Sequence, residues 1–504
     1  MSSIKASQVG LFVGPLLFFA SLFLNLDPSN PSVTYTLAIA LLMAVWWITE
    51  AVPIAVTSLL PVALFPLFGV MNGKAVSSTY FNHVIFLFIG GFLVALAMEK
   101  WNLHKRIALK LLMMVGTKPA NILFGFMFST AFLSMWMSNT ATTMMMIPIV
   151  LSVISGLESS LEGKAKRFQI ALLLGIAYAA SIGGIATLVG TPPNLSFTRI
   201  FSLIFPQAPE INFVSWFIFA LPLSIMLFMV AFFWLLYLYH PGKNWKHPSK
   251  ELFKDQYKKL GKASFEEKVV FIIFLLMALL WITHHGLKLG THEIKGWSSF
   301  FPNPSYINDG TIAIFLSSIL FMIPAKSKKA SRILEGDIIG KLPWRIVLLF
   351  GGGFALATGF TQSGLSVWFG EQLKWVSTYS PFMVVFSISI LMSLLTNLTS
   401  NTATTEMLLP ILAGLAVSIK VNPLLFMLPA TLAASLAFML PVATPPNAII
   451  FGTNKIKITD MIKTGFLINI VSVIILSIWV YYFGSYIFHI DAGNFPAWAV
   501  IAKH

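Results

Sequence analysis

The segment SMWMSNTATTMMMIP, residues 134–148, places hydroxyl and amide side chains inside one of the most apolar parts of the chain. A nearly identical segment, LTSNTATTEMLLP, follows at residues 398–410. Polar groups at membrane depth normally face other protein or a water-filled cavity, because hydrocarbon cannot satisfy them. The two copies of the SNT motif therefore indicate both the architecture of the chain and the position of a ligand site.

The composition is that of a polytopic membrane protein. Of the 504 residues, 57% are hydrophobic and 10% are charged, whereas soluble domains carry about 25% charged residues. We expect an all-α membrane protein with about 11 transmembrane helices, each of roughly 20 apolar residues. The expected spans are residues 9–27, 33–50, 52–70, 84–99, 168–197, 212–239, 269–285, 308–325, 345–361, 424–453 and 464–488. The absence of cysteine excludes disulfides, thiolate metal sites and thiol catalysis.

The net charge of +15 is explained by membrane topology rather than by a nucleic-acid partner. With a cytoplasmic N-terminus, the predicted cytoplasmic stretches hold 26 of the 33 Lys and Arg residues. This asymmetry follows the positive-inside rule. We expect a multi-pass protein of the inner (plasma) membrane whose C-terminus is extracellular or periplasmic. The basic linker, residues 241–268, is predicted to be a solvated cytoplasmic loop, with contact to lipid headgroups as the alternative.

The chain also contains an internal repeat. Four blocks occur twice in the same order, and the SNT motifs form one of these pairs. The other pairs are LLMAVWWIT (41–49) with LLMALLWIT (275–283), FIGGFLVALAMEKWNL (88–103) with FGGGFALATGFTQSGL (350–365), and AASIGGIATLVGTPPN (179–194) with AASLAFMLPVATPPN (433–447). Such periodicity indicates duplication. Each copy holds five expected spans, so the two halves form an inverted five-helix repeat, which is typical of secondary transporters.

Residues 120–155 and 381–418, which carry the SNT motifs, are too long to be single helices across a bilayer. A straight helix of about 35 residues would be roughly 52 Å long. We therefore expect two re-entrant helical hairpins that turn at the SNT motifs, where Ser and Asn cap the helices that follow. Hydrogen-bonding contact between packed helices is the alternative for a single SNT motif.

The TPPN motifs predict two broken helices, within residues 168–197 and 424–453. Consecutive prolines at 192–193 and 445–446 forbid a continuous helix. The residue before a proline is pushed to extended backbone, so Thr191 and Thr444 should be unwound. Each break exposes a helix N-terminus, which attracts anions, and free carbonyls, which attract cations. Simple proline bends in packed helices are the alternative.

These segments contain neutral oxygens and almost no charge. No Lys, Arg or His lies in residues 120–163, 175–198, 381–419 or 424–454, and Glu406 is the one charge beside the SNT motifs. Neutral oxygen ligands without a carboxylate cage suit Na+ better than Ca2+ or a transition metal. We therefore expect an anion that is bound together with Na+.

Together with WWITEAVP at residues 46–53, these motifs resemble the divalent anion/sodium symporter family over essentially the whole chain. The resemblance implies a homodimer in the lipid bilayer and an elevator mechanism. It implies a scaffold domain at residues 1–118 and 269–380 and a transport domain at residues 119–240 and 381–504, joined by the cytoplasmic linker 241–268.

The resemblance also implies two Na+ sites and a dicarboxylate site. The first Na+ site would comprise Ser134, Ser138, Asn139 and the backbone of Gly190. The second would comprise Thr396, Asn401 and the backbone around Thr399 and Ala443. The carboxylates would meet Asn139, Thr140, Ser400, Asn401 and Thr402, with Thr191, Thr444 and Pro445 nearby. The resemblance implies no cofactor besides co-transported Na+.

The function that we expect is Na+-coupled import of a C4-dicarboxylate such as succinate. Alternatives on the same fold are a sodium-independent dicarboxylate exchanger and a tricarboxylate or sulfate carrier. Some exchangers of the family carry Arg after Asn-Thr-Ala; Thr142 and Thr404 stand there in this chain and favour symport. A passive anion channel is disfavoured, and an intramembrane enzyme would need a nucleophile–base pair that the repeated segments lack. We expect a capping or pairing role for Glu50 and a surface position for His284.

Overall fold

The computed structural model describes residues 6–158, 164–241, 251–284, 286–289, 292–491 and 493–499. The first half contains α1 (Ala6–Ser21), α2 (Pro31–Thr49), α3 (Ile54–Thr57), α4 (Leu60–Leu67), α5 (Gly73–Ser78), α6 (His83–Lys100), α7 (Leu103–Val115), α8 (Pro119–Ser134), α9 (Asn139–Glu158), α10 (Lys164–Ile185), α11 (Pro192–Ile204), α12 (Phe213–Tyr239) and α13 (Glu251–Lys259). Parts of the predicted cytoplasmic stretches, residues 159–163 and 242–250, lie outside the described residues, as do residues 500–504.

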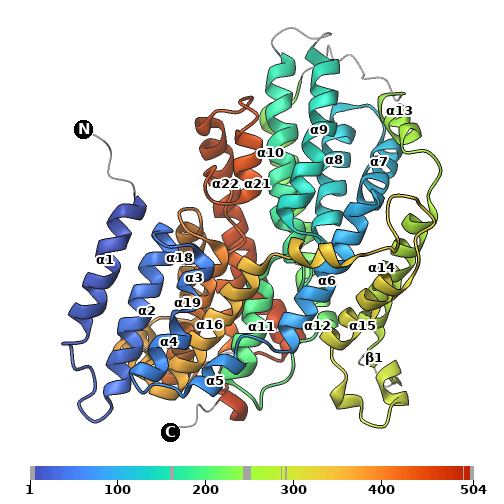
Figure 1. The fold of residues 1–504 in the computed structure, drawn as a ribbon. Coiled ribbons are helices and arrows are strands. Elements are labelled where there is room, and N and C mark those ends of the chain that lie inside the picture. Colours follow the sequence, from blue (N-terminus) through green and yellow to red (C-terminus); the bar gives the residue numbers. More distant parts are fainter. Residues whose placement is uncertain are drawn as a thin grey trace.

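The second half repeats this order of helices (Figure 1). It contains α14 (Phe265–Thr283), α15 (Asp309–Met322), α16 (Trp344–Ser363), α17 (Leu365–Gln372), α18 (Pro381–Thr396), α19 (Asn401–Ser418), α20 (Leu424–Ala433), α21 (Pro445–Phe451), α22 (Ile458–Ile478) and α23 (Gly484–Phe488), with a π-helical turn at Trp479–Phe483. The fold is helical as predicted. The described residues add one small antiparallel pair, β1 (Leu287–Leu289) and β2 (His292–Ile294), in which Leu287 lies opposite Ile294.

The helix bounds reproduce the sequence repeat. Both ends of α2 and α14 are 234 positions apart, and both ends of α8 and α18 are 262 positions apart. A left-handed residue precedes the corresponding helices α7 and α17: Asn102 has φ 58° and Gly364 has φ 81°. In Figure 1, α8 and α9 lie in the upper part of the molecule and α18 and α19 in the lower part. Duplication has thus preserved turn geometry as well as hydrophobicity.

Among the described residues, six helical segments are long and apolar enough to cross a membrane by length and composition. These segments are Pro31–Thr49, Gly73–Lys100, Arg167–Ile185, Phe213–Tyr239, Trp344–Ser363 and Ile458–Phe488. The expected span 52–70 is not one helix but the pair α3 and α4. Pro61 stands at the second position of α4 and has no N–H to donate to the preceding turn, so the helix is interrupted there.

The linker is only partly the solvated loop that the sequence suggested, because its described part forms α13 and packs on α7 and α8. Phe253 is buried, with its ring centroid 6.1 Å from that of Phe126. Arg106 of α7 lies 2.9 Å from Glu267 and 5.4 Å from the ring centroid of Tyr257. Helix α13 thus buries one face against α7.

His284 does not lie at the surface, so that expectation was wrong. Its side chain is buried, and Nδ1 lies 3.3 Å from Oδ1 of Asp309 at the start of α15. The loop after β2 covers it, since Ser298 Oγ donates to the His284 carbonyl at 2.8 Å. Glu50 is exposed and stands at the C-cap of α2 in a left-handed conformation, which agrees with the expected capping role.

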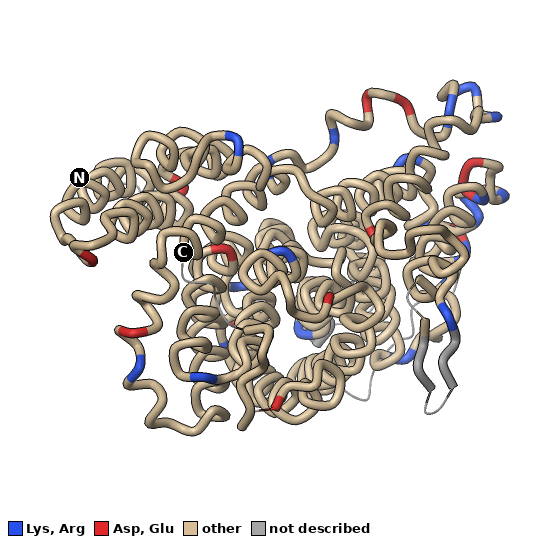
Figure 2. Tube along the Cα trace, turned by 90° about the horizontal axis from the view of Figure 1, so that it is seen from below, with Lys and Arg blue, Asp and Glu red and all other residues tan. Residues whose placement is uncertain are grey.

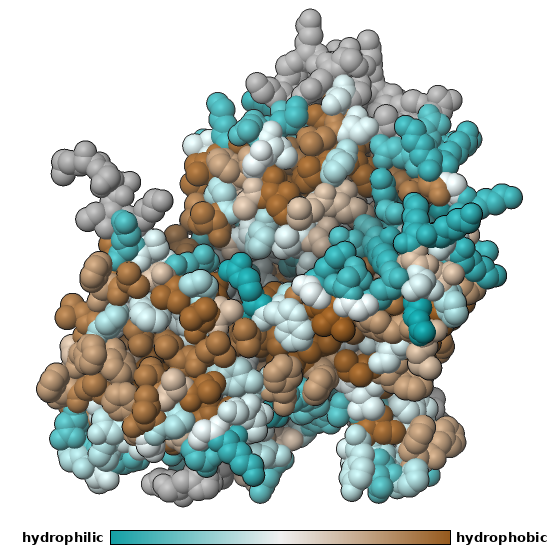
Figure 3. Space-filling view, in the orientation of Figure 1, coloured by the Kyte–Doolittle hydropathy of each residue, from teal (hydrophilic) through white to brown (hydrophobic). Residues whose placement is uncertain are grey.

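The surface divides into apolar and charged regions. Figure 3 shows apolar side chains over the lobe built from α1, α2 and α4, and polar side chains gathered over α13 and its neighbours. In Figure 2 most of the tube is uncharged, and Lys and Arg are frequent toward the edge that holds α13. Side chains of α1 such as Phe12 and Phe19 are largely exposed, as expected where a helix faces lipid.

Candidate functional site

The two hairpins turn where the sequence predicted. Helix α8 ends at Ser134 and α9 begins at Asn139, and in the second half α18 ends at Thr396 and α19 begins at Asn401. Each SNT serine caps the helix that follows. Ser138 Oγ accepts a hydrogen bond from Ala141 N at 3.1 Å, and Ser400 Oγ accepts one from Ala403 N at 3.5 Å. Each helix then presents its first-turn N–H groups, which the helix itself does not satisfy, at the hairpin tip.

Both TPPN helices are broken, as predicted. Helix α10 ends at Ile185 before α11 begins at Pro192, and α20 ends at Ala433 before α21 begins at Pro445. Thr191 (φ −144°, ψ 140°) and Thr444 (φ −144°, ψ 151°) adopt the extended backbone expected before proline. The second break, residues 434–444, is longer than the first, residues 186–191.

The asparagine that ends each TPPN motif hydrogen-bonds to the unwound segment of the broken helix. The sequence analysis did not predict this role. Asn194 Nδ2 lies 2.7 Å from the carbonyl of Thr187 and 3.3 Å from that of Ile185. Asn447 Nδ2 lies 3.0 Å from the carbonyls of both Ala437 and Leu440. Since each amide donates to carbonyls left free by the unwound backbone, it holds the break in one shape. The occurrence of Asn at the end of both TPPN motifs was the sign in the sequence from which this role could have been predicted.

Four oxygens converge where the first hairpin meets the first break. Ser134 Oγ lies 2.5 Å from Asn139 Oδ1 and 2.8 Å from the carbonyl of Ala180. The same atom of the Asn139 amide lies 3.2 Å from the Ala180 carbonyl and 3.3 Å from the Gly190 carbonyl. An amide oxygen cannot bond to two carbonyls. The group is satisfied when the amide is flipped, so that its nitrogen, which carries two hydrogens, faces these three oxygens.

Two glycines make this convergence sterically possible. A Cβ at Gly184 would lie 2.8 Å from Asn139 Oδ1 and 3.0 Å from the Gly190 carbonyl. A Cβ at Gly190 would lie 2.5 Å from the Gly184 carbonyl. The backbone can therefore approach the Asn139 amide only because both positions lack a side chain.

The structure thus brings together Ser134, Asn139 and Gly190 of the predicted first Na+ site. It adds the carbonyl of Ala180, which the sequence analysis did not name. Ser138 contacts the helix it caps, and Thr140 is half-buried in the first turn of α9.

The predicted second Na+ site is assembled less tightly. Asn401 Oδ1 is buried and has no hydrogen-bond partner in the described part of the chain. Thr399 Oγ1 lies 2.7 Å from Thr404 Oγ1, whereas Thr396 Oγ1 donates back to the Met392 carbonyl of its own helix at 2.9 Å. Asn401 Oδ1 can therefore still accept a partner, whereas the Thr396 hydroxyl is engaged with the carbonyls of its own helix.

A polar group behind the second hairpin was not predicted. Asn397 Oδ1 accepts from Met439 N at 3.1 Å, and Ser393 Oγ donates to the Leu436 carbonyl at 3.0 Å. Asn469 Nδ2 of α22 donates to Ser393 Oγ at 3.0 Å. These bonds tie the longer second break to α18 and α22. Asn397, three residues before the second SNT motif, was the one sign of this group in the sequence.

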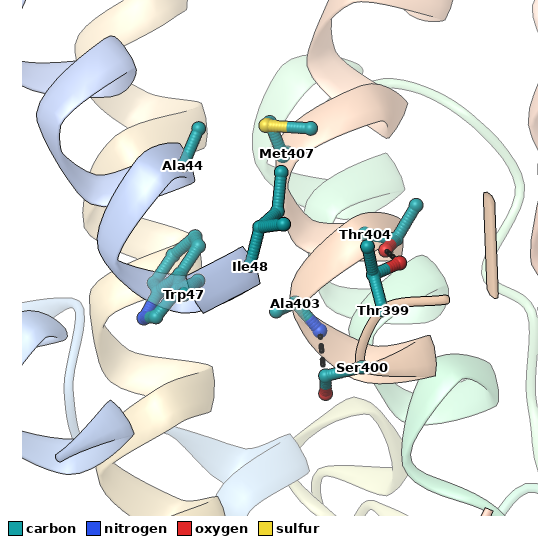
Figure 4. A pocket seen from close by; sticks show the side chains of 8 residues that line it. All are labelled: Ala44, Trp47, Ile48, Thr399, Ser400, Ala403, Thr404 and Met407. Atoms are coloured by element: carbon teal, nitrogen blue, oxygen red, sulfur yellow. Dashed lines mark hydrogen bonds between the residues drawn. The ribbon is translucent and has the colours of Figure 1, made fainter. Parts of the chain in front are cut away.

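The two breaks differ in exposure. Every residue from 171 to 191 is buried, whereas Val442 in the second break is 77% exposed and Pro445 is also exposed. A small pocket beside the second SNT motif separates α2 from α19 (Figure 4). Its lining residues are Ala44, Trp47 and Ile48 of α2 and Thr399, Ser400, Ala403, Thr404 and Met407 of the second hairpin.

Comparisons with known proteins agree with this architecture. Residues 17–490 match the family model described as the sodium:sulfate symporter transmembrane region. The chain is 46% identical over 497 residues to the sodium-dependent dicarboxylate transporter SdcS of Staphylococcus saprophyticus, a match that covers 96% of this chain and 92% of that protein. The SdcS protein of Staphylococcus aureus strain MRSA252 matches with the same identity and coverage.

Two solved structures share the fold at low sequence identity. The YdaH transporter of Alcanivorax borkumensis matches with a TM-score of 0.54 and 14% identity, covering 80% of this chain and 85% of that one. MtrF of Neisseria gonorrhoeae, described as one of a class of antimetabolite efflux pumps, matches with a TM-score of 0.54 and 14% identity, covering 81% and 84%. At this identity the likeness extends to the fold alone.

Proposed function

This chain belongs to the family of the sodium:sulfate symporter transmembrane region, and from that premise we propose that it imports a C4-dicarboxylate, such as succinate, together with Na+. Family membership makes it a multi-pass membrane transporter and not an enzyme. The names of its relatives support Na+ and dicarboxylates as the transported species. The observation that carries the proposal is the meeting of the first hairpin tip with the first helix break, where the Ser134 hydroxyl, the Asn139 amide and the carbonyls of Ala180 and Gly190 lie together without a charged side chain.

The first Na+ ion binds between Ser134 Oγ, Asn139 Oδ1 and the carbonyls of Ala180 and Gly190. All four are neutral hard oxygens, which suit a monovalent cation. The second ion binds beside Asn401, whose Oδ1 has no hydrogen-bond partner among the described residues and can accept it. The hydroxyl of Thr396 has to rotate from the Met392 carbonyl to join it, and the backbone of Thr399 and Ala443 completes the set.

The dianion binds between the two hairpin tips. One carboxylate meets Asn139 and Thr140 at the start of α9, and the other meets Ser400, Asn401 and Thr402 at the start of α19. Thr191 and Thr444, at the N-cap positions of α11 and α21, lie alongside with Pro445. No helix among α8, α9, α18, α19, α20 and α21 carries a basic side chain. The anion is therefore held by helix N-termini, neutral donors and the co-bound Na+ ions.

Transport proceeds by an elevator motion in a homodimer. The transport domain, residues 119–240 and 381–504, moves against the scaffold domain, residues 1–118 and 269–380. In support, α11 and α19 pack against α16, and Figure 4 shows side chains of α2 facing the second hairpin across a pocket. Figure 1 shows α9, α10 and α22 reaching beyond the ends of α1 and α2.

This conformation is the inward-facing one. With the N-terminus in the cytoplasm and the C-terminus on the opposite side, the second break lies on the cytoplasmic path of the substrate. Val442 and Pro445 are open there, whereas the first break is sealed. A substrate released from this state would therefore leave toward the cytoplasm.

Uptake into proteoliposomes tests the function. Purified protein is reconstituted into vesicles without Na+, and labelled succinate is added with external Na+ or with external choline. We expect labelled succinate to accumulate inside the vesicles above its external concentration when Na+ is present outside, and not when choline replaces Na+. Unlabelled malate, fumarate, 2-oxoglutarate, citrate and sulfate, each added with and without Na+, then define the substrate class.

The same vesicles distinguish the alternatives. Uptake that ignores the Na+ gradient but requires dicarboxylate inside the vesicle would establish an exchanger and contradict symport. Stronger competition by citrate or sulfate than by any C4-dicarboxylate would contradict the proposed substrate.

A further inference from the structure

Glu406 of α19 is a fully buried carboxyl group in the membrane-spanning part of the chain, and the proposed Na+ and substrate sites do not use it. It follows Thr402 by one helical turn and is 0% exposed. Its Oε1 accepts a hydrogen bond from Ser196 Oγ of α11 at 2.5 Å. Its Oε2 has no hydrogen-bond partner in the described residues. An ionisable group at membrane depth is rare without a functional role.

The carboxyl group occupies the space that a side chain at Gly353 of α16 would fill. A Cβ placed on Gly353 of α16 would overlap Glu406 Oε2. Helices α11 and α19 belong to the proposed transport domain, and α16 belongs to the proposed scaffold. Glu406 is therefore sealed into the surface along which these two bodies slide.

No charged group balances Glu406. Apart from Glu406, α19 has no charged residue, and neither α2, α3, α4 nor α20 has one. Helix α16 has Arg345, which is exposed two turns before Gly353, and α17 has Glu371, which pairs with Lys374. Helix α11 has Arg199, whose electrostatic neighbour is His83 of α6. In the described residues, none of these groups forms an ion pair with Glu406.

A metal ion does not fit this place as well as a proton does. The described residues contain no group of three His, Asp or Glu side chains that could hold a metal. Within the described part of the chain, the Ser196 hydroxyl is the one group that hydrogen-bonds to the carboxyl group. A bound cation takes several oxygens. A proton needs one oxygen, and it removes the charge that burial penalises most.

We propose that Glu406 is a proton-binding positioning residue, which must carry a proton whenever the transport domain is sealed against Gly353 of the scaffold. In the exposed state between seals, the carboxylate exchanges this proton with water. Glu406 takes up the proton from water before the two domains seal against each other, and it releases the proton to water after they separate. The proton is therefore required for the domain movement but is not itself transported. The inference rests on the proposed transport function, since it assigns Glu406 to the sliding surface of that transporter.

The consequence is a transport rate that depends on pH. If the sealed state binds one proton that the open state lacks, each rise of one pH unit lowers the ratio of sealed to open protein by up to tenfold. Turnover therefore falls toward alkaline pH. Glu406→Gln keeps the size of the side chain and is uncharged at every pH, so its rate should no longer follow pH.

The test measures uptake of fumarate, whose two carboxyl groups stay ionised across the range, from pH 6.0 to 8.5. We expect the wild-type rate to fall by tenfold or more, and the Glu406→Gln rate to vary by less than twofold. The matched control is Glu371→Gln, which removes an exposed carboxyl group of α17 and should keep the wild-type profile. A flat wild-type profile, or the wild-type fall in Glu406→Gln, would overturn the proposal. So would a Glu406→Gln defect confined to Na+ dependence, which would make Glu406 a Na+ ligand.

If Glu406→Gln does not insert into the membrane, infrared spectroscopy of the wild type decides. A protonated carboxyl group absorbs apart from a carboxylate, and we expect its band at pH 7.5 in the protein without substrate. The absence of that band would contradict the proposal. The pH profile can be measured with a Na+ gradient or with internal dicarboxylate. Failure of symport therefore remains distinguishable from failure of this inference.

Discussion

At the scale of single residues, the site depends on small side chains as much as on polar ones. Ser134 and Asn139 supply oxygens, but Gly184 and Gly190 let the backbone come close enough to supply more. This arrangement makes two kinds of substitution informative: one removes an oxygen, and the other fills space.

Ser134→Ala removes one oxygen from the proposed first Na+ site. A hydrogen-bonding or ligating oxygen is worth about 1 to 2 kcal/mol, so we expect the Na+ concentration for half-maximal uptake to rise roughly 5- to 30-fold. The control is Ser155→Ala, which removes an exposed hydroxyl of α9 that bonds only to its own helix. Unchanged Na+ dependence in Ser134→Ala would remove this residue from the site.

Gly184→Ala adds a methyl group against the Asn139 amide and the Gly190 carbonyl, at 2.8 and 3.0 Å. Contacts this short force the break to shift, so we expect uptake to fall at least tenfold while the protein still inserts and folds. Gly340→Ala is the matched control, because nothing lies within 4 Å of its added carbon. Normal uptake and Na+ affinity in Gly184→Ala would show that this close approach is not needed.

At the scale of elements, each broken helix works as one unit with the hairpin beside it. In both halves a TPPN asparagine donates to carbonyls of the unwound segment. In the second half Asn397, Ser393 and Asn469 fasten the same segment from the other side. The unwound backbone is therefore held by side chains, as buried polar backbone must be.

Asn447→Ala should weaken the second break. Two buried carbonyls, those of Ala437 and Leu440, lose their donor. The free energy of unfolding should drop by about 1 to 3 kcal/mol, with a lower melting temperature in detergent and weaker Na+ binding. Asn494→Ala, at an exposed position near the C-terminus, provides the control. A melting temperature equal to that of the wild type would contradict the proposed role of Asn447.

The sequence predicted the elements well because their causes are local. Prolines at 192–193 and 445–446 end helices wherever they occur, and an SNT turn between two apolar stretches forms a hairpin under the same rules. Ala180, Ser393 and Asn469 escaped prediction because their roles depend on which helices pack together. His284 was misplaced for the same reason: its neighbour Asp309 lies across a loop that the sequence alone does not fold.

At the scale of the whole molecule, the first break is buried and the second is partly exposed, which is the basis for the proposed inward-facing assignment. The chain has no cysteine, so one introduced cysteine can be labelled without ambiguity. Val442, which is 77% exposed, is the most informative position in the second break.

Val442→Cys should react with a membrane-impermeant maleimide in inside-out vesicles and at least tenfold more slowly in intact cells. The physical reason is that, in the proposed inward-facing state, water would reach this side chain only from the cytoplasmic side. Phe300→Cys, 87% exposed in the predicted external loop, should show the opposite preference. Equal reaction of Val442→Cys from both sides, with Phe300→Cys restricted to one, would contradict the inward-facing assignment.

The unequal lengths of the two breaks have a kinetic consequence. The first break spans residues 186–191 and lies against the Ser134 and Asn139 side chains, whereas the second spans residues 434–444, and Asn401 Oδ1 beside it has no hydrogen-bond partner in the described residues. A preorganised site loses little entropy on binding, and a loose one must order first. Loading should therefore be sequential. One cation occupies the N-terminal half rapidly, and the C-terminal half becomes ordered only as the second cation and the anion arrive.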